Sequence, residues 1–274
     1  AGLVTVPLNL ALTNESLVGK VYQRKAFAVA APLVAFMGTF VAWYSPLLSE
    51  SFGPLQPVLR DNFWLTIHVL TIVSSYGAGA LAWGLSILAL CYYLFGKYRS
   101  PAAPSQSDDR YQPADGQAGH SLARRPPAAC NELAGYIYKT QQVAVLLLAA
   151  GTLLGGFWAD VSWGRFWGWD PKEVWALISL LVYLAVLHAR YAGWVGNFGL
   201  VAGSVLGMSA IAFSWYGVNF VLGAGLHSYG FGAGGQWEVG TFVVANWILL
   251  AAAAGRYSGN TSGGVEAPIP EQGE

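Results

Sequence analysis

Long apolar runs, almost free of charge, alternate with short polar segments along most of this chain. Six such runs occur at roughly 27–48, 63–95, 137–158, 172–192, 197–217 and 237–254. A helix needs about 20 mostly apolar residues to cross the hydrocarbon core of a bilayer, and these runs have roughly that length or more. The pattern therefore predicts an all-α, polytopic integral membrane bundle of about six transmembrane helices.

The polar segments divide the chain into five parts. Residues 100–135 contain a stretch rich in Pro, Ala, Ser, Gln and Asp, which cannot bury enough apolar surface to fold. The predicted parts are an N-terminal segment (1–26), the first two helices with an outer loop (27–99), a disordered cytoplasmic loop (100–135), four further helices (136–256) and a disordered cytoplasmic tail (257–274).

Charge and cysteine content exclude several classes of protein. Only 10% of the residues are charged and the formal net charge is 0, so no basic stripe exists to bind nucleic acid. The two cysteines, Cys91 and Cys130, form no CxxC or CxxCH pattern. The chain is therefore neither a thioredoxin-like carrier nor a c-type cytochrome itself.

The distribution of positive charge predicts the orientation in the membrane. Eleven of the 14 Lys and Arg residues fall before the first run, in or beside 100–135, or at the ends of the fourth and sixth runs. Short loops rich in Lys and Arg stay on the cytoplasmic side. Both ends of this chain are then cytoplasmic, and the turns at 159–171 and 218–236 lie on the outer face of a bacterial inner membrane or a thylakoid-like membrane.

Tryptophans crowd the turn between the third and fourth runs. Five of the 12 Trp residues fall within eighteen positions, namely Trp158, Trp163, Trp167, Trp169 and Trp175. An interfacial belt explains two or three tryptophans at helix ends, but not five in one turn. We expect an aromatic surface for a large flat ligand such as a porphyrin, built on either a helix or an irregular shelf.

The residues that close this turn predict the start of the fourth helix. Asp170 can cap it, Pro171 suits the first helical position, and Glu173 completes a capping box. Asp170 is thus either a helix cap or a direct contact of the ligand. Gly164 and Gly168 allow the preceding turn to bend tightly.

Three of the four histidines are candidate metal ligands; His120 lies in the predicted disordered loop. His68, early in the second run, and His227, in the loop 218–236, both fall on the outer side. Two histidines from separate elements beside an aromatic surface are typical of bis-imidazole ligation of haem iron. His188 lies about 24 Å along the fourth helix, near its cytoplasmic end, and cannot share their site.

The stretch WGRFWGWDPKEVWAL resembles the tryptophan-rich WWD motif of haem-handling proteins in cytochrome c biogenesis. The continuation LVYLAVLHAR and the segments NFWLTIHV and GLHSYG resemble the CcsA/ResC type (system II). The resemblance covers roughly residues 55–254.

This resemblance implies a role in haem export and in a holocytochrome c synthase (haem lyase) complex. It implies no catalytic residue in this chain. His68 and His227 correspond to external ligands of haem b (iron protoporphyrin IX), bound transiently as a substrate, and His188 to an inner haem site. Implied partners are a ResB/Ccs1-type membrane protein and an apocytochrome c carrying CxxCH. The aromatic faces of the WWD motif would bind the porphyrin. Arg165 or Lys172 would pair with its propionates, unless both cations only snorkel to the interface.

Two other haem functions stay open on the sequence. One is a system I protein of the CcmC or CcmF type, which the Pro-Lys-Glu-Val-Trp continuation disfavours. The other is a b-type electron-transfer subunit, which would need histidines paired on facing helices. A plain transporter leaves the histidine placement unexplained. Family members also carry more helix before the first run, so truncation of the segment 1–26 is a further expectation.

Overall fold

A bundle of long helices forms the protein. A computed structural model describes residue 32 and residues 34–40, 62–99, 124–227 and 234–261. Within these ranges the main elements are α4 (Asn62–Phe95), α5 (Ala128–Trp163), α6 (Pro171–Tyr191), α7 (Asn197–Ala212), the π-helix η2 (Phe213–Leu222) and α8 (Gln236–Thr261). Counting α7 with η2, five helices of the described part are long and apolar enough to cross a membrane. The predicted polytopic membrane bundle is confirmed. Of the first predicted run, 27–48, only residues 32 and 34–40 are described, and they are helical.

The helix α5 begins earlier than the sequence predicted. Its first residue is Ala128, so the predicted loop 100–135 is wrong over its last part; residues 100–123 lie outside the described ranges. The reason is burial: Cys130, Leu133 and Ala134 all pack into the main apolar cluster of the bundle. Apolar positions three and four apart form one face of a helix, which favours helix over loop here.

The helix α8 likewise extends beyond the predicted boundary at 256. It ends at Thr261, because Tyr257 stacks on Phe198 with ring centroids 4.7 Å apart and meets Tyr93 edge-on at 5.5 Å. These aromatic contacts hold the last turns of α8 against α4 and α7. The remainder of the predicted tail, 262–274, lies outside the described residues.

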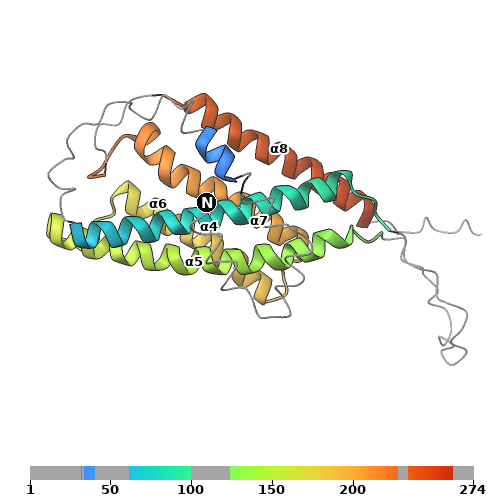
Figure 1. Ribbon diagram of the computed structural model, residues 1–274, viewed down its shortest axis with the longest axis horizontal. Helices are drawn as coiled ribbons and strands as arrows, with labels where there is room; N and C mark the ends of the chain where they lie inside the picture. The colour runs from blue at the N-terminus through green and yellow to red at the C-terminus, as the bar shows by residue number, and fades with distance from the viewer. Residues whose placement is uncertain (1–31, 33, 41–61, 100–123, 228–233, 262–274) are drawn as a thin grey trace, which may run out of the picture.

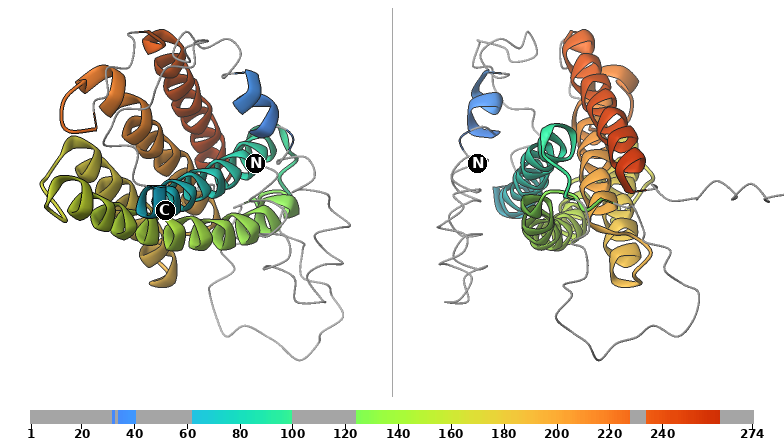
Figure 2. Two further views of the ribbon diagram at one scale, coloured as in Figure 1. Left: turned by 60° about the vertical axis from the view of Figure 1, so that its left-hand side comes forward. Right: turned by 90° about the vertical axis from the view of Figure 1, so that its right-hand side faces the viewer.

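The chain direction brings several helix ends together. In Figure 1, α4 and α5 lie side by side and antiparallel, α6 and α7 pack against this pair, and α8 lies beside α4 and α7, away from α5. Both views of Figure 2 show the same grouping. The start of α4, the end of α5, the start of α6 and the end of η2 therefore meet at one end of the bundle.

Two glycines one turn apart allow α4 and α5 to approach closely at that end. A Cβ on Gly151 would lie 3.1 Å from the backbone nitrogen of Ile72, and one on Gly155 only 2.7 Å from Cε1 of His68. Such small-xxx-small spacing is a common basis of helix packing in membranes. The His68 ring thus occupies the space that a side chain at position 155 would fill.

We expect Gly155→Ala to destabilise the protein although alanine is the better helix former. The added methyl would displace the His68 ring, at a cost of about 1–3 kcal/mol typical of overpacking. Gly135→Ala, on the same helix, is the matched control, because a Cβ there meets nothing within 4 Å. Thermal unfolding in detergent should show a lower midpoint for Gly155→Ala and an equal or higher one for Gly135→Ala. Equal midpoints for the two variants would show that the close approach is unimportant.

Candidate functional site

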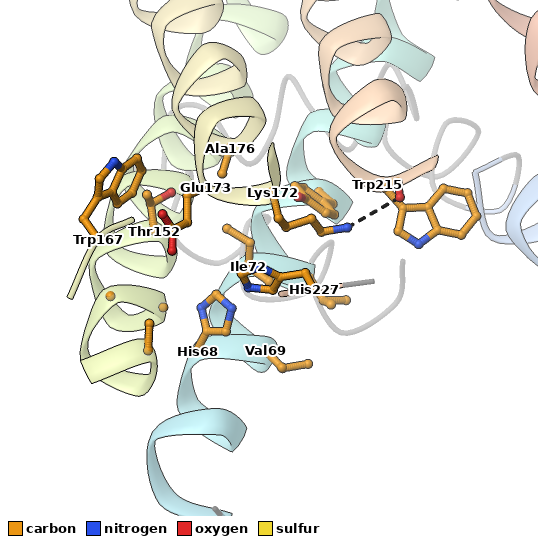
Figure 3. A pocket seen from close by; sticks show the side chains of 15 residues that line it. His68, Val69, Ile72, Thr152, Trp167, Lys172, Glu173, Ala176, Trp215 and His227 are labelled. Carbon is orange, nitrogen blue, oxygen red and sulfur yellow. Dashed lines mark hydrogen bonds between the residues drawn. The ribbon is translucent and has the colours of Figure 1, made fainter. Parts of the chain in front are cut away.

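A cavity of about 230 Å³ lies where these helix ends meet. Figure 3 shows side chains from α4, α5, α6, η2 and the loop after η2 converging on it. Its lining is largely apolar, with two histidines, one lysine and one carboxylate among the polar groups. The lining residues are His68, Val69, Ile72, Val73, Tyr76, Thr152, Gly155, Gly156, Ala159, Trp167, Lys172, Glu173, Ala176, Trp215 and His227.

The backbone of α5 fixes the orientation of His68. Its Nδ1 lies 2.8 Å from the carbonyl oxygen of Gly151, and the ring stacks parallel to Trp158 at a centroid distance of 6.4 Å. A carbonyl can only accept a hydrogen bond, so Nδ1 carries the hydrogen. The lone pair of Nε2 is therefore available to a ligand.

Asp170 fixes the orientation of His227 in the same way. Nδ1 of His227 lies 2.7 Å from Oδ1 of Asp170, and Oδ2 of Asp170 accepts the backbone N–H of Leu226 at 2.5 Å. The side chain of His227 is 17% exposed. A carboxylate that accepts from Nδ1 sets the tautomer and raises the basicity of Nε2, which is the usual second partner of a metal-bound histidine.

Burial and the carboxylate of Asp170 act on the pKa of His227 in opposite directions. Burial lowers the pKa of His227 below its usual value, while the hydrogen bond and the charge of Asp170 oppose that shift. The effect of burial is the larger of the two. Burial therefore disfavours the protonated form of His227, and neutral imidazole is the form that ligates metals.

The capping role predicted for Asp170 is confirmed, and a second role accompanies it. Oδ1 accepts the backbone N–H of Lys172, Glu173 bonds back to the N–H of Asp170, and Pro171 occupies the first helical position. Gly225 packs so closely on Asp170 that it has no space for a Cβ, and its φ is +94°. The carboxylate that starts α6 thus also holds the His227 loop.

The five tryptophans do not share one exposed surface. Trp158 is 2% exposed and lies against both histidines, whereas Trp169 is 71% exposed. Trp163 meets His227 edge-on at 4.8 Å, and Trp175 packs on Phe213 of η2 at 4.0 Å. Among the five only Trp167 lines the cavity.

The motif combines a helix end with an irregular turn. Trp158 and Trp163 belong to the last turns of α5, and the capping residue Gly164 that follows has a left-handed φ of 69°. The residues from there to Asp170 are irregular, and Trp169 itself has a φ of 57°. The predicted need for glycine in this turn is confirmed at position 164.

Arg165 holds the turn together. Its Nη1 lies 3.1 Å from Oε1 of Glu173, and its guanidinium lies over the ring of Trp163 at 5.7 Å. Oε2 of Glu173 accepts the backbone N–H of Gly168 at 2.8 Å. Arg165 does not line the cavity.

His188 is distant from this cavity. It lies in the last turn of α6, where its Nδ1 bonds to the Leu184 carbonyl of the same helix at 2.7 Å and its side chain is exposed on the bundle. Fifteen residues separate it from Glu173, which is about 22 Å of helix. The structure therefore brings His68 and His227 together and leaves His188 apart, as the sequence predicted.

The donor set suits haem better than a bare metal ion. Among the described residues, no group of three or more His, Cys, Asp or Glu side chains is placed to hold a metal ion. Haem iron brings four nitrogens of its own and needs only two axial ligands from protein. Two imidazoles held through hydrogen bonds at Nδ1, in an apolar cavity beside tryptophans, fit that requirement.

Sequence reasoning missed several parts of the site. Tyr76, Thr152 and Trp215 line the cavity without any local signal in the sequence. The spacing of Gly151 and Gly155 was a signal that could have identified the close approach beside His68. The contact between Asp170 and His227 joins residues 57 positions apart, which a single sequence does not reveal.

We expect Asp170→Asn to release the His227 loop. Asparagine has one oxygen, whereas Asp170 accepts from Lys172 N, Leu226 N and His227 Nδ1, so at least one buried donor loses its acceptor at a cost of about 1–3 kcal/mol. Hydrogen–deuterium exchange should rise in the peptide containing Leu226 and His227. Asp160→Asn, an exposed position on α5, serves as the control and should leave that peptide unchanged. Unchanged exchange in Asp170→Asn would disprove the coupling.

Comparison with known proteins gives an independent assignment. A family model described as Cytochrome C assembly protein matches residues 3–227. A protein of Synechococcus sp. (strain RCC307) named cytochrome c biogenesis protein CcsA is 37% identical over 207 residues, covering 74% of this chain and 65% of its own. Proteins of the same name in Synechococcus sp. (strain CC9902) and Prochlorococcus marinus (strain MIT 9313) are 38% and 35% identical, again over 74% of this chain.

The matched region thus spans about two thirds of the length of these relatives. The match to the family model, residues 3–227, contains α4, α5, α6, α7 and η2, together with both histidines of the cavity. This integral membrane protein belongs to the cytochrome c assembly protein family.

Proposed function

We propose that this protein presents haem for covalent attachment to apocytochrome c, as a subunit of a holocytochrome c synthase. The family assignment and the name of the relatives, cytochrome c biogenesis protein CcsA, support a role in cytochrome c maturation. The observation that carries the finer proposal is the pair His68 and His227. Both rings line one cavity, and each is held by a hydrogen bond at Nδ1.

Attachment of haem to the thiols of CxxCH requires correct positioning of the reactants and no nucleophile from this protein. Each cysteine of CxxCH adds its thiol across a haem vinyl group: the C–S bond forms at the carbon next to the ring, and the hydrogen goes to the terminal carbon. The addition is balanced without an oxidant. Holding the vinyl groups and the thiols in register is then the main contribution of the site. The histidine of CxxCH displaces one axial ligand when the product leaves.

The wider assembly follows from the same proposal. The cavity end of the bundle faces the outer side of the membrane, and the basic opposite end, with Arg99, Arg125 and Arg256, faces the cytoplasm. His188 belongs to an inner haem site near the cytoplasmic side. Its exposed position on α6 suits a site shared with a ResB/Ccs1-type partner, which would supply the second ligand.

The competing haem functions differ from this one in their expected geometry. A b-type electron-transfer subunit would pair histidines on facing helices, whereas His227 lies in the loop after η2. The relatives named above favour the CcsA type over the system I type. A synthase subunit transfers its haem to CxxCH, whereas an electron-transfer subunit retains it, so haem transfer distinguishes the two functions.

We expect the purified protein to bind haem with a low-spin, bis-imidazole absorption spectrum. His68→Gly and His227→Gly should each lose this spectrum and weaken haem binding at least tenfold, and added imidazole should restore the spectrum by filling the vacated position. His188→Ala is the control, because it lies outside the cavity and should bind added haem at the outer site normally.

Two outcomes would refute the proposal. Absence of bound haem, or unchanged spectra in both glycine variants, would exclude ligation by His68 and His227. Normal assembly of a reporter cytochrome c by the double glycine variant would exclude the synthase role even if haem binds.

A further inference from the structure

One cation in the cavity has no ion-pair partner among the described residues. Lys172, in the first turn of α6, lines the cavity together with His68 and His227, and Figure 3 shows its amine extending toward Trp215. Its Nζ lies 3.2 Å from Oδ1 of Asn219 and 3.5 Å from the carbonyl oxygen of Trp215. Both acceptors are neutral. Among the described residues, no carboxylate lies within ion-pair distance of this amine.

The nearby carboxylates are already committed to other groups. Glu173 is bound by Arg165 and by the backbone N–H groups of Gly168 and Asp170. Asp170 itself accepts from His227 and from two backbone N–H groups. Turning either carboxylate toward Lys172 would break these hydrogen bonds. The positive charge of Lys172 is therefore left facing a largely apolar cavity, where an unpaired charge is costly.

The amine of Lys172 can donate one further hydrogen bond. An ammonium group has three N–H donors, and Asn219 and Trp215 use two of them. The two contacts also hold the long side chain against η2, so that less conformational entropy is lost when a ligand binds. An anionic oxygen in the cavity would complete the set and supply the missing charge.

Arg165, the other cation of the motif, is not equivalent. Its guanidinium is paired with Glu173 and lies over Trp163, and it does not line the cavity. Recruiting it would break the ion pair that holds the turn. The structure thus separates two cations that the sequence could not distinguish.

We propose that Lys172 binds a carboxylate of the ligand held between His68 and His227, which for haem is a propionate. This inference rests on the function proposed above. The two propionates of protoporphyrin IX lie at one edge of the ring and the vinyl groups lie away from that edge. A propionate on Lys172 places the acidic edge at α6 and η2 and turns the reactive vinyl groups away from them, so Lys172 sets the orientation of haem rather than its ligation.

A pair of ligands tests this contact. Haem and its dimethyl ester share the iron and the vinyl groups, but esterification adds a methyl group to each propionate and removes its charge. The wild-type protein should bind haem about tenfold more tightly than the ester, as expected for one charge-assisted hydrogen bond. Lys172→Met should lose most of this preference by weakening haem binding alone, with ester binding and the bis-imidazole spectrum unchanged. Lys172→Arg should retain part of the preference.

Two further variants serve as references. Lys139→Met removes a lysine from α5 outside the cavity and should keep the full preference. Arg165→Met should weaken both ligands alike, because it disturbs the turn.

The proposal is overturned if the wild-type protein shows no preference, if Lys172→Met keeps it, or if Arg165→Met alone abolishes it. These outcomes differ from failure of the proposed function itself, in which neither ligand would give a bis-imidazole spectrum with the wild-type protein.

Discussion

The carboxylate of Asp170 is the interaction on which the site depends. Its two oxygens accept hydrogen bonds from the backbone of Lys172 at the start of α6, from the backbone of Leu226 and from the His227 ring. One side chain therefore joins three parts of the chain: the tryptophan-rich turn, the N-terminus of α6 and the loop after η2. The positive end of the α6 dipole also favours an anion there, and no described lysine or arginine forms an ion pair with this carboxylate.

The other histidine depends on helix packing instead of on a charge. His68 fits above Gly155 and donates to the Gly151 carbonyl, so its position follows from how closely α4 and α5 approach. Trp158 lies against both histidines and so contacts both parts of the site. The result is a pair of rings that line one cavity, each held by a hydrogen bond at Nδ1. A rigid pair of this kind suits a ligand that must be held in one orientation and then released.

Much of this arrangement could be predicted from local features of the sequence. The lengths of the apolar runs gave the bundle, Asp170-Pro171-Lys172-Glu173 gave the start of α6, and charge asymmetry placed His68 and His227 at the same end. What failed depends on tertiary contacts: Trp158 is buried rather than part of an exposed surface, and residues 128–135 are helical because they pack into the core. The second role of Asp170 is equally invisible in the sequence, since capping alone explains its presence.

The central claim is that both histidines offer Nε2, and not Nδ1, to haem iron. Hyperfine spectroscopy of the ferric haem complex, with histidine labelled by ¹⁵N at either ring nitrogen, tests it most directly. Label at Nε2 should produce strong coupling from two axial nitrogens, and label at Nδ1 only weak coupling. Strong coupling from the Nδ1 label, or a high-spin signal with fewer than two coordinated imidazoles, would contradict the account.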